Sequence, residues 1–82
     1  MSETSPTLSK AIAAEIRAEL ARKQLDAKAL GPVLGLSKNT IYSRVNGQSD
    51  FTTSEITKAA AFFGVTEYEL LMTARNTAAR AA

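Results

Sequence analysis

Residues 37–46 carry a group of side chains that could bind a polyanion and read hydrogen-bonding groups on it. If this segment is a helix, Ile41 and Val45 lie on one apolar edge at a spacing of four residues, with Leu36 just ahead of them. The polar edge holds two cations and several side chains that both donate and accept hydrogen bonds: Lys38, Asn39, Thr40, Tyr42, Ser43, Arg44 and Asn46. That combination, with no carboxylate in it, suits contact with phosphates and with base edges.

The charge of the chain is small but unevenly distributed. The net charge of +2 does not by itself indicate a nucleic-acid partner. Within residues 27–49, however, the charged residues are Lys28, Lys38 and Arg44, and the sequence has no acidic residue there. A local basic patch raises the rate of encounter with a polyanion and adds affinity that salt weakens.

The composition excludes most catalytic chemistry. The 82 residues include no cysteine and no histidine, which rules out a disulfide framework, a thiolate metal site and the usual proton shuttle. The sequence also shows no evident acid and base pair and no glycine-rich phosphate loop. A chain of this length forms one domain, and we expect a binding module without enzymatic activity, cofactor, metal or small-molecule ligand.

The sequence also predicts a location and a division of the chain. It has no apolar run of membrane-spanning length, and its first residues lack the charged start and apolar centre of a secretory signal. We therefore expect a cytoplasmic protein, associated with the nucleoid in a bacterial host. Residues 1–7 are expected to form a partly flexible arm, residues 8–72 the domain, and residues 73–82 a helical extension or a frayed tail.

Five helical segments are predicted to position these side chains. No alternating pattern indicates a strand, so the predicted fold class is all-α. The first helix is expected to open near Ser5 and Pro6, because serine caps helices and proline suits the first turn, and to end near Lys23.

A glycine turn separates the second and third predicted helices. The second is expected to follow the cap Asp26 and to stop at Gly35, with a bend or a tightened turn at Pro32, since proline removes a backbone hydrogen bond. The third is expected to begin after the cap Ser37 and to end at residues 46–47, where glycine can take a left-handed conformation.

Two capping-box signatures predict the last two helices. Thr52 and Glu55 open the fourth, which Gly64 ends, and Thr66 and Glu69 open the fifth. The predicted core consists of large apolar residues at helical spacing: Leu8, Ile12, Ile16, Leu20, Leu30, Leu36, Ile41, Val45, Ile56, Phe63, Val65 and Leu70.

The junction Leu34-Gly35-Leu36-Ser37 matches the helix-turn-helix arrangement, in which the second helix of the pair enters the major groove. Further matching residues are Gly31, Ile41, Asn46, Gly47 and the pattern Ala60-x-x-Phe63-Gly64-Val65-x-x-x-x-Leu70. From about Ile12 to Leu71 the chain resembles the lambda-repressor and Cro-like helix-turn-helix family, also called the xenobiotic-response-element type. Phage repressors, small bacterial regulators and antitoxins have this domain, and the resemblance implies a five-helix DNA-binding domain over residues 8–72.

The resemblance implies that DNA contacts lie in and around the third helix. Ser37, Lys38, Asn39 and Ser43 would be base or near-base contacts, flanked by Tyr42 and Arg44. Lysine suits a guanine edge or a phosphate, and asparagine can make a two-point contact with adenine. The full set of expected DNA contacts is Lys28, Ser37, Lys38, Asn39, Thr40, Tyr42, Ser43, Arg44, Asn46 and Gln48.

Besides Pro32 inside the second predicted helix, the chain departs from the family pattern at two further places. Many members begin the first helix of the pair with a phosphate-binding glutamine, whereas this chain has Ala27, so Lys28 or the backbone amides would have to compensate. Many members also join the first helix to the end of the recognition helix by a buried arginine and glutamate. The corresponding positions here look like Leu20 and Val45, an apolar pair.

Side chains of the fourth and fifth helices are candidates for a dimer interface. They are large or long groups that the predicted core does not need: Phe62, Tyr68, Leu71, Met72 and Arg75. The resemblance favours two copies on half-sites about one DNA turn, roughly 34 Å, apart. The alternative is that these residues only close the core.

The leading hypothesis is a dimeric, sequence-specific regulator of transcription that binds a double-stranded DNA operator, most like a phage repressor or Cro-type protein. One alternative is an excisionase-like recombination directionality factor that uses the same DNA contact. Another is an antitoxin or other protein-interaction module.

Overall fold

The computed structural model describes residues 7–81, and every regular element in this range is helical. In chain order the elements are α1 (Leu8–Arg22), the 3₁₀ helix η1 (Ala27–Ala29), α2 (Gly31–Leu34), α3 (Lys38–Val45), α4 (Thr53–Phe63) and α5 (Glu67–Ala81). The predicted all-α class with five helices is confirmed. Within residues 7–81 the helices lack the length and apolar character needed to cross a membrane.

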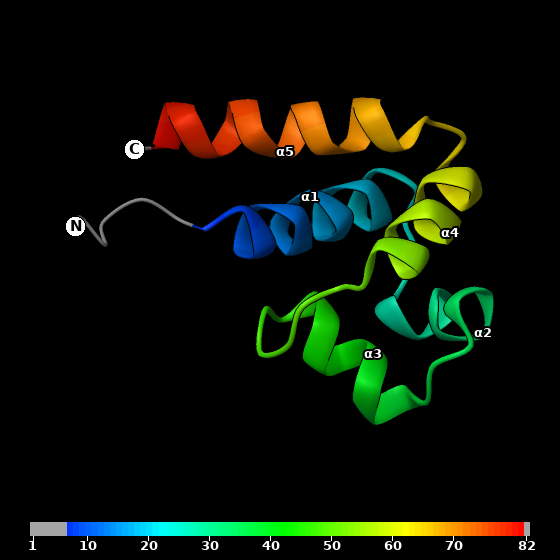
Figure 1. Ribbon diagram of the computed structural model, residues 1–82. Coiled ribbons are helices and arrows are strands. Elements are labelled where there is room, and N and C mark those ends of the chain that lie inside the picture. Colours follow the sequence, from blue (N-terminus) through cyan, green and yellow to red (C-terminus); the bar gives the residue numbers. More distant parts are fainter. Residues whose placement is uncertain (1–6, 82) are drawn as a thin grey trace.

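The first and last helices lie side by side, although they come from opposite ends of the chain (Figure 1). Helix α4 contacts both α5 and α2, while α3 contacts α1, α2 and η1. Figure 1 shows α2 and α3 on the side of the molecule away from α5. The α1, α4 and α5 layer therefore forms a base that supports the α2 and α3 pair.

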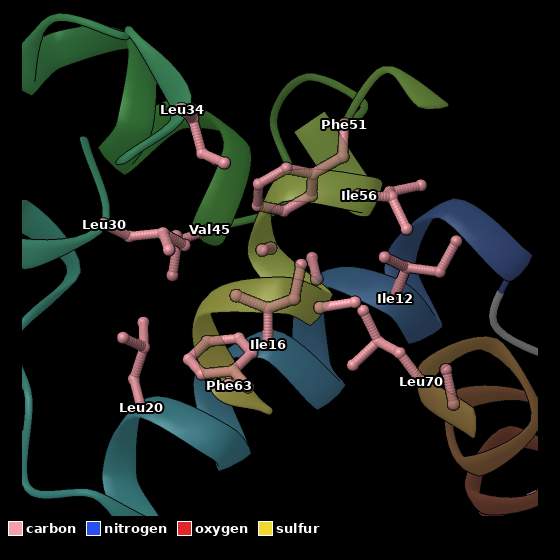
Figure 2. Close-up of a cluster of buried hydrophobic side chains, with 14 of the residues drawn as sticks. Ile12, Ile16, Leu20, Leu30, Leu34, Val45, Phe51, Ile56, Phe63 and Leu70 are labelled. Carbon is pink, nitrogen blue, oxygen red and sulfur yellow. The ribbon is translucent and has the colours of Figure 1, made fainter. Parts of the chain in front are cut away.

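One hydrophobic core joins all five helices, and its side chains converge from α1, α4 and the α2 and α3 pair (Figure 2). Ile16, Leu30 and Ile41 are fully buried at its centre. Most of the predicted core residues are buried, although Leu36 and Val65 are only partly so.

The prediction that Leu8 belongs to the core is wrong, since this residue is 52% exposed. Leu8 is the first residue of α1, and the buried part of that helix begins at Ala11. The four-residue spacing of apolar residues in α1 is correct, but toward the N-terminus it continues past the point where α1 has a packing partner.

Helix α1 begins later than the sequence predicts. Its cap is Thr7, whose hydroxyl accepts a hydrogen bond of 3.2 Å from the amide of Lys10. The predicted start at Ser5 and Pro6 lies outside the described residues. At the other end, Gln24 takes a left-handed conformation with φ of 57° and ends the helix.

The predicted second helix is divided into η1 and α2. Asp26 caps η1 by accepting from the amide of Lys28, and Pro32 stands in the first turn of α2, where its missing N–H costs no hydrogen bond. The prediction of one helix bent or tightened at Pro32 is therefore corrected: the tightened turn is η1, which ends before Pro32, and Pro32 opens a new helix. Gly35 then turns the chain with φ of 72°, as predicted.

The predicted caps of the last three helices are confirmed. Ser37 caps α3, Thr52 and Glu55 form a full capping box on α4, and Gly64 ends α4 with φ of 79°. The amide of Thr66 donates to Glu69, and the amide of Glu69 donates to Thr66, so α5 begins with the same arrangement. Helix α5 then continues through residues 73–81 against α1.

Candidate nucleic-acid interface

The start of α3 presents a compact set of polar side chains. The Ser37 hydroxyl accepts from the amide of Thr40 at 3.3 Å and donates to the Thr40 hydroxyl at 3.0 Å, so these two residues shape the first turn. Lys38 and Asn39 lie within that turn, and both side chains are exposed. A cation and an amide are therefore held on a well-capped helix end, free to meet a ligand.

Tyr42, one turn further along α3, is joined to the start of η1. Its hydroxyl donates to Oδ1 of Asp26 at 2.9 Å, and the same oxygen accepts from the amide of Lys28. The Lys28 amide first, and then the Tyr42 hydroxyl, lower the pKa of Asp26, while the carboxylate raises the pKa of Tyr42. Tyr42 therefore ties α3 to the cap of η1.

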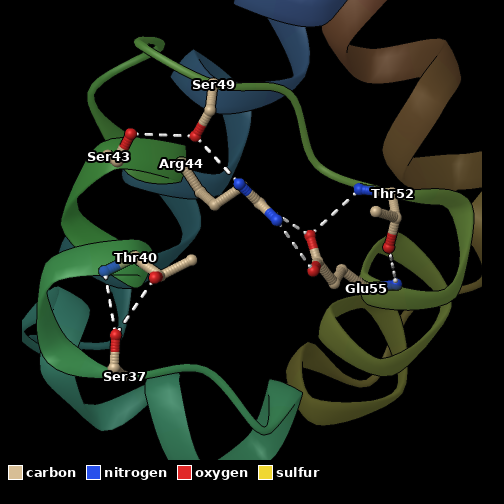
Figure 3. Close-up of polar contacts among 7 residues, drawn as sticks. All are labelled: Ser37, Thr40, Ser43, Arg44, Ser49, Thr52 and Glu55. Carbon is tan, nitrogen blue, oxygen red and sulfur yellow. Dashed lines mark hydrogen bonds and ion pairs between the residues drawn. The ribbon is translucent and has the colours of Figure 1, made fainter.

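Arg44 does not point outward as predicted, and this expectation is wrong. Its Nε donates to Oε1 of Glu55 at 2.9 Å and its Nη2 donates to Oε2 at 3.3 Å, so a carboxylate of α4 holds the guanidinium from one side (Figure 3). The Arg44 side chain is 19% exposed. The edge of α3 expected to have two free cations and no carboxylate thus has one exposed cation, Lys38, and one paired cation.

The pair has the electrostatic properties of a strong ion pair. Hydrogen bonds from Arg44 lower the pKa of Glu55 in spite of the opposing effect of burial, and the carboxylate in turn raises the pKa of Arg44. Both groups therefore stay charged across the physiological range. Two charge-assisted hydrogen bonds between a guanidinium and one carboxylate add geometric specificity as well as energy.

Ser43 also contributes to structure. Its hydroxyl lies 2.8 Å from the hydroxyl of Ser49, which accepts from Nη1 of Arg44 at 2.9 Å. The carbonyl of Ser43 accepts from the amides of Gln48 and Ser49. The loop after α3 is thereby folded back onto the end of that helix.

A third contact joins α3 to α1. Nη1 of Arg17 donates to the main-chain carbonyl of Val45. The sequence predicted an apolar link between Leu20 and Val45 at this place; both residues are buried, but the polar link comes from Arg17. The positive φ of Gly47 lets the chain leave α3 directly beyond this point.

Four residues of these contacts were not among the predicted site residues: Arg17, Asp26, Ser49 and Glu55. Asp26 and Glu55 were recognised only as caps, and each accepts a second bond from α3. A carboxylate oxygen can accept more hydrogen bonds than one cap uses, and this unused capacity could have suggested a second hydrogen-bond donor for Asp26 and Glu55.

The remaining predicted DNA contacts stay accessible. Lys28, Asn46 and Gln48 are exposed, and Lys28 lies next to the Asp26 and Tyr42 contact. The helix therefore divides along its length. Its first turn is open to solvent, whereas residues 42–45 make contacts within the protein.

The dimer candidates differ in exposure. Tyr68 is 71% exposed and Phe62 is 39% exposed, although the Phe62 ring lies against that of Phe63 with centroids 5.5 Å apart. Arg75 is exposed, and Leu71 and Met72 are half-buried. These exposures leave room for a partner on the start of α5.

Comparison with known proteins identifies the arrangement. A family model described as helix-turn-helix matches residues 14–70. A crystal structure of the clp gene regulator ClgR from Corynebacterium glutamicum has a TM-score of 0.83 at 19% identity, covering 92% of this chain and 80% of that one. A second ClgR structure has a TM-score of 0.77 at 18% identity, covering 88% and 94%. At these identities the likeness concerns the fold. No curated protein matches the sequence.

Proposed function

The chain belongs to the lambda-repressor/Cro-like helix-turn-helix family of DNA-binding transcriptional regulators, and we propose that it is a repressor of the phage repressor or Cro kind. In this proposal α3 docks in the major groove of a double-stranded operator. Lys38 and Asn39 read base edges there, and occupancy of the operator blocks polymerase. The protein acts in the cytoplasm, associated with the nucleoid.

The observation that carries the proposal is the open first turn of α3. Recognition helices of this kind contact bases mainly through their N-terminal residues. Lys38 and Asn39 are exposed there on a helix that Ser37 caps, and their chemistry matches guanine and adenine edges. The helix end also carries partial positive charge, which favours a nearby phosphate.

Three further residues suit contacts with the DNA backbone. Lys28 at η1, and Asn46 and Gln48 beyond α3, are exposed and flank the first turn of α3 in the sequence. Contacts of this type fix register and orientation without reading sequence. Lys28 would thus supply a phosphate contact in place of the glutamine that many members have one position earlier.

The proposal includes a homodimer on DNA. One module of this size covers a single major groove, and two copies related by a two-fold axis would cover half-sites roughly 34 Å apart. The exposed Tyr68 and Arg75 and the half-buried Leu71 and Met72 lie on one helix, α5, with Phe62 close by in the sequence. They are the proposed interface.

Selection of bound sequences from random duplex DNA tests this function. We expect one preferred site with inverted half-sites, bound less tightly as salt rises. Lys38→Ala should weaken binding to that site by about tenfold, the cost of losing one good base contact. Lys58→Ala removes an exposed lysine from α4 and serves as the matched control. No enriched sequence, or equal losses in both variants, would contradict the proposal.

A further inference from the structure

We propose that Arg44 and Glu55 are positioning residues for DNA recognition, which set the orientation of α3 relative to α4 and so decide which base edges Lys38 and Asn39 reach. This inference rests on the proposed docking of α3 in the major groove. It assigns neither Arg44 nor Glu55 a contact with DNA, although arginine on a recognition helix ordinarily suggests one.

The guanidinium of Arg44 is held within the protein through each of its nitrogens. All three nitrogens of Arg44 donate hydrogen bonds within the protein: Nε and Nη2 to Glu55, and Nη1 to Ser49. Three of its five N–H groups are used in these bonds and the side chain is only 19% exposed, so moving the guanidinium outward to a phosphate would leave the Glu55 carboxylate, 11% exposed, without its cation. Losing the partner of a largely buried charge is costly.

Glu55 is itself held in place by the cap of α4. Its Oε1 accepts from the amide of Thr52 at 3.0 Å, and its own amide donates to the Thr52 hydroxyl at 3.1 Å (Figure 3). The carboxylate is therefore fixed to the first turn of α4. Arg44 binds a rigid support, so the pair transmits the position of α4 to the end of α3.

Helix α3 is only eight residues long, and a few contacts restrain its orientation. Ile41 and Val45 anchor one edge of the helix in the core. Residues 42 and 44 are about 200° apart around the helix axis, so the Tyr42 and Arg44 contacts restrain rotation from two sides. Base readout tolerates errors of about 0.5 Å, so this restraint decides whether the first turn of α3 is in register.

The experiment compares Arg44→Ala and Glu55→Gln with the wild type on the selected operator and on a scrambled duplex, over a range of salt concentrations. Glutamine at residue 55 can still accept from the Thr52 amide, so the capping box stays while the ion pair is lost. We expect both variants to lose about tenfold in affinity for the operator relative to the scrambled duplex, the size of one mismatched base pair. The salt slope should stay as in the wild type.

The double variant and Arg44→Lys complete the test. If the two residues act as one unit, the double variant with Arg44→Ala and Glu55→Gln should lose no more operator affinity than Arg44→Ala alone. Lysine keeps the charge of Arg44 but cannot form the two-bond contact, so Arg44→Lys should resemble Arg44→Ala. A direct phosphate contact gives the opposite pattern and overturns the proposal: the salt slope of Arg44→Ala falls by about one, and Glu55→Gln binds as well as the wild type or better.

Lys38→Ala separates this proposal from the function on which it depends. If Lys38→Ala loses operator affinity while Arg44→Lys and Glu55→Gln bind as the wild type, the positioning role is overturned and the docking of α3 stands. If Lys38→Ala also binds as the wild type, the docking of α3 is itself contradicted. Circular dichroism at the assay temperature checks the folding of each variant, and Arg44→Lys and Glu55→Gln replace Arg44→Ala if it does not fold.

Discussion

Tyr42 of α3 donates a hydrogen bond of 2.9 Å from its hydroxyl to the carboxylate of Asp26, which caps η1. Helix α3 is thus joined to the start of η1 by a polar contact at the surface as well as by the core. Phenylalanine has the shape of tyrosine without its hydroxyl, so Tyr42→Phe removes this hydrogen bond alone. We expect a lower melting temperature, and Tyr68→Phe at the exposed tyrosine of α5 should leave it unchanged.

The difference in stability between Tyr42→Phe and the wild type should shrink as the pH falls. The folded pKa of Asp26 is lowered, so the stability that its charge contributes is present above its unfolded pKa, about 3.9, and is lost as the pH falls through the folded pKa. Thermal unfolding between pH 7 and pH 3 should show a difference in melting temperature between the two proteins. This difference should be constant near pH 7 and should shrink at the acid end. A difference that widens in acid would contradict this assignment.

Glu55→Gln should destabilise the protein at pH 7 by about 2 kcal/mol, because it weakens hydrogen bonds to a charged partner. The folded pKa of Glu55 is lowered, chiefly by Arg44. The contribution is therefore complete above the unfolded pKa, about 4.3, and is lost as the pH falls through the folded pKa. Urea unfolding at pH 7 and pH 3 measures it, and the two proteins should converge in acid. An undiminished difference at pH 3 would count against the ion pair.

Gly31→Ala should destabilise the protein by about 1–3 kcal/mol through crowding. A Cβ at this buried position would lie 3.1 Å from the carbonyl oxygen of Leu36 and 3.6 Å from Cγ2 of Ile41, so α2 and α3 would have to move apart. Calorimetry measures the loss. Gly31→Ser should be no milder, because its Cβ meets the same atoms.

Gly35 provides a contrasting control for that prediction. A Cβ at this residue meets no atom within 4 Å, but its φ of 72° is unfavourable for most side chains. Gly35→Ala should therefore cost about 1 kcal/mol by backbone strain alone. Asparagine tolerates this conformation better, so Gly35→Asn should destabilise the protein less than Gly35→Ala. If crowding were the cause, Gly35→Asn would destabilise it more.

Gln24→Gly should stabilise the protein by about 0.5–1 kcal/mol. Gln24 has φ of 57°, and its neighbourhood has the hydrogen bonds of a glycine-type helix end: Leu25 to the Leu20 carbonyl at 2.8 Å and Gln24 to the Ala21 carbonyl at 3.0 Å. Gln48→Gly is the matched control, because Gln48 is also exposed but does not have a positive φ. Glycine at residue 48 should therefore be neutral or destabilising. Equal melting temperatures for both variants would contradict the strain at residue 24.

The parts of the fold that the sequence predicts correctly depend on local interactions. The caps at Ser37, Thr52 and Thr66, and the turn at Gly35, involve residues no more than five positions apart. Pro32 likewise marks an irregularity in the predicted second helix, although the structure places it in the first turn of a separate helix, α2. Such features can be read from a single segment because its neighbours in the sequence are also its partners.

The parts that the sequence does not predict depend on how the helices are placed. Arg44 and Glu55 are 11 residues apart, and Arg17 and Val45 are 28 residues apart. Periodicity places Arg44 on the polar edge of α3, but it does not show that the first turn of α4 faces that edge. The exposure of Leu8 has the same origin, since a helical pattern does not show where the neighbouring helix ends.

With Arg44 neutralised by Glu55, α3 has a single cation left with an exposed side chain, Lys38. Sliding along a duplex relies on cations that exchange one phosphate for the next, irrespective of sequence. With Lys28 the only other exposed cation proposed for the docking face, contacts with arbitrary DNA are few and brief. The protein should therefore search a genome mainly by release and renewed collision, and few molecules should be sequestered at sites without regulatory meaning.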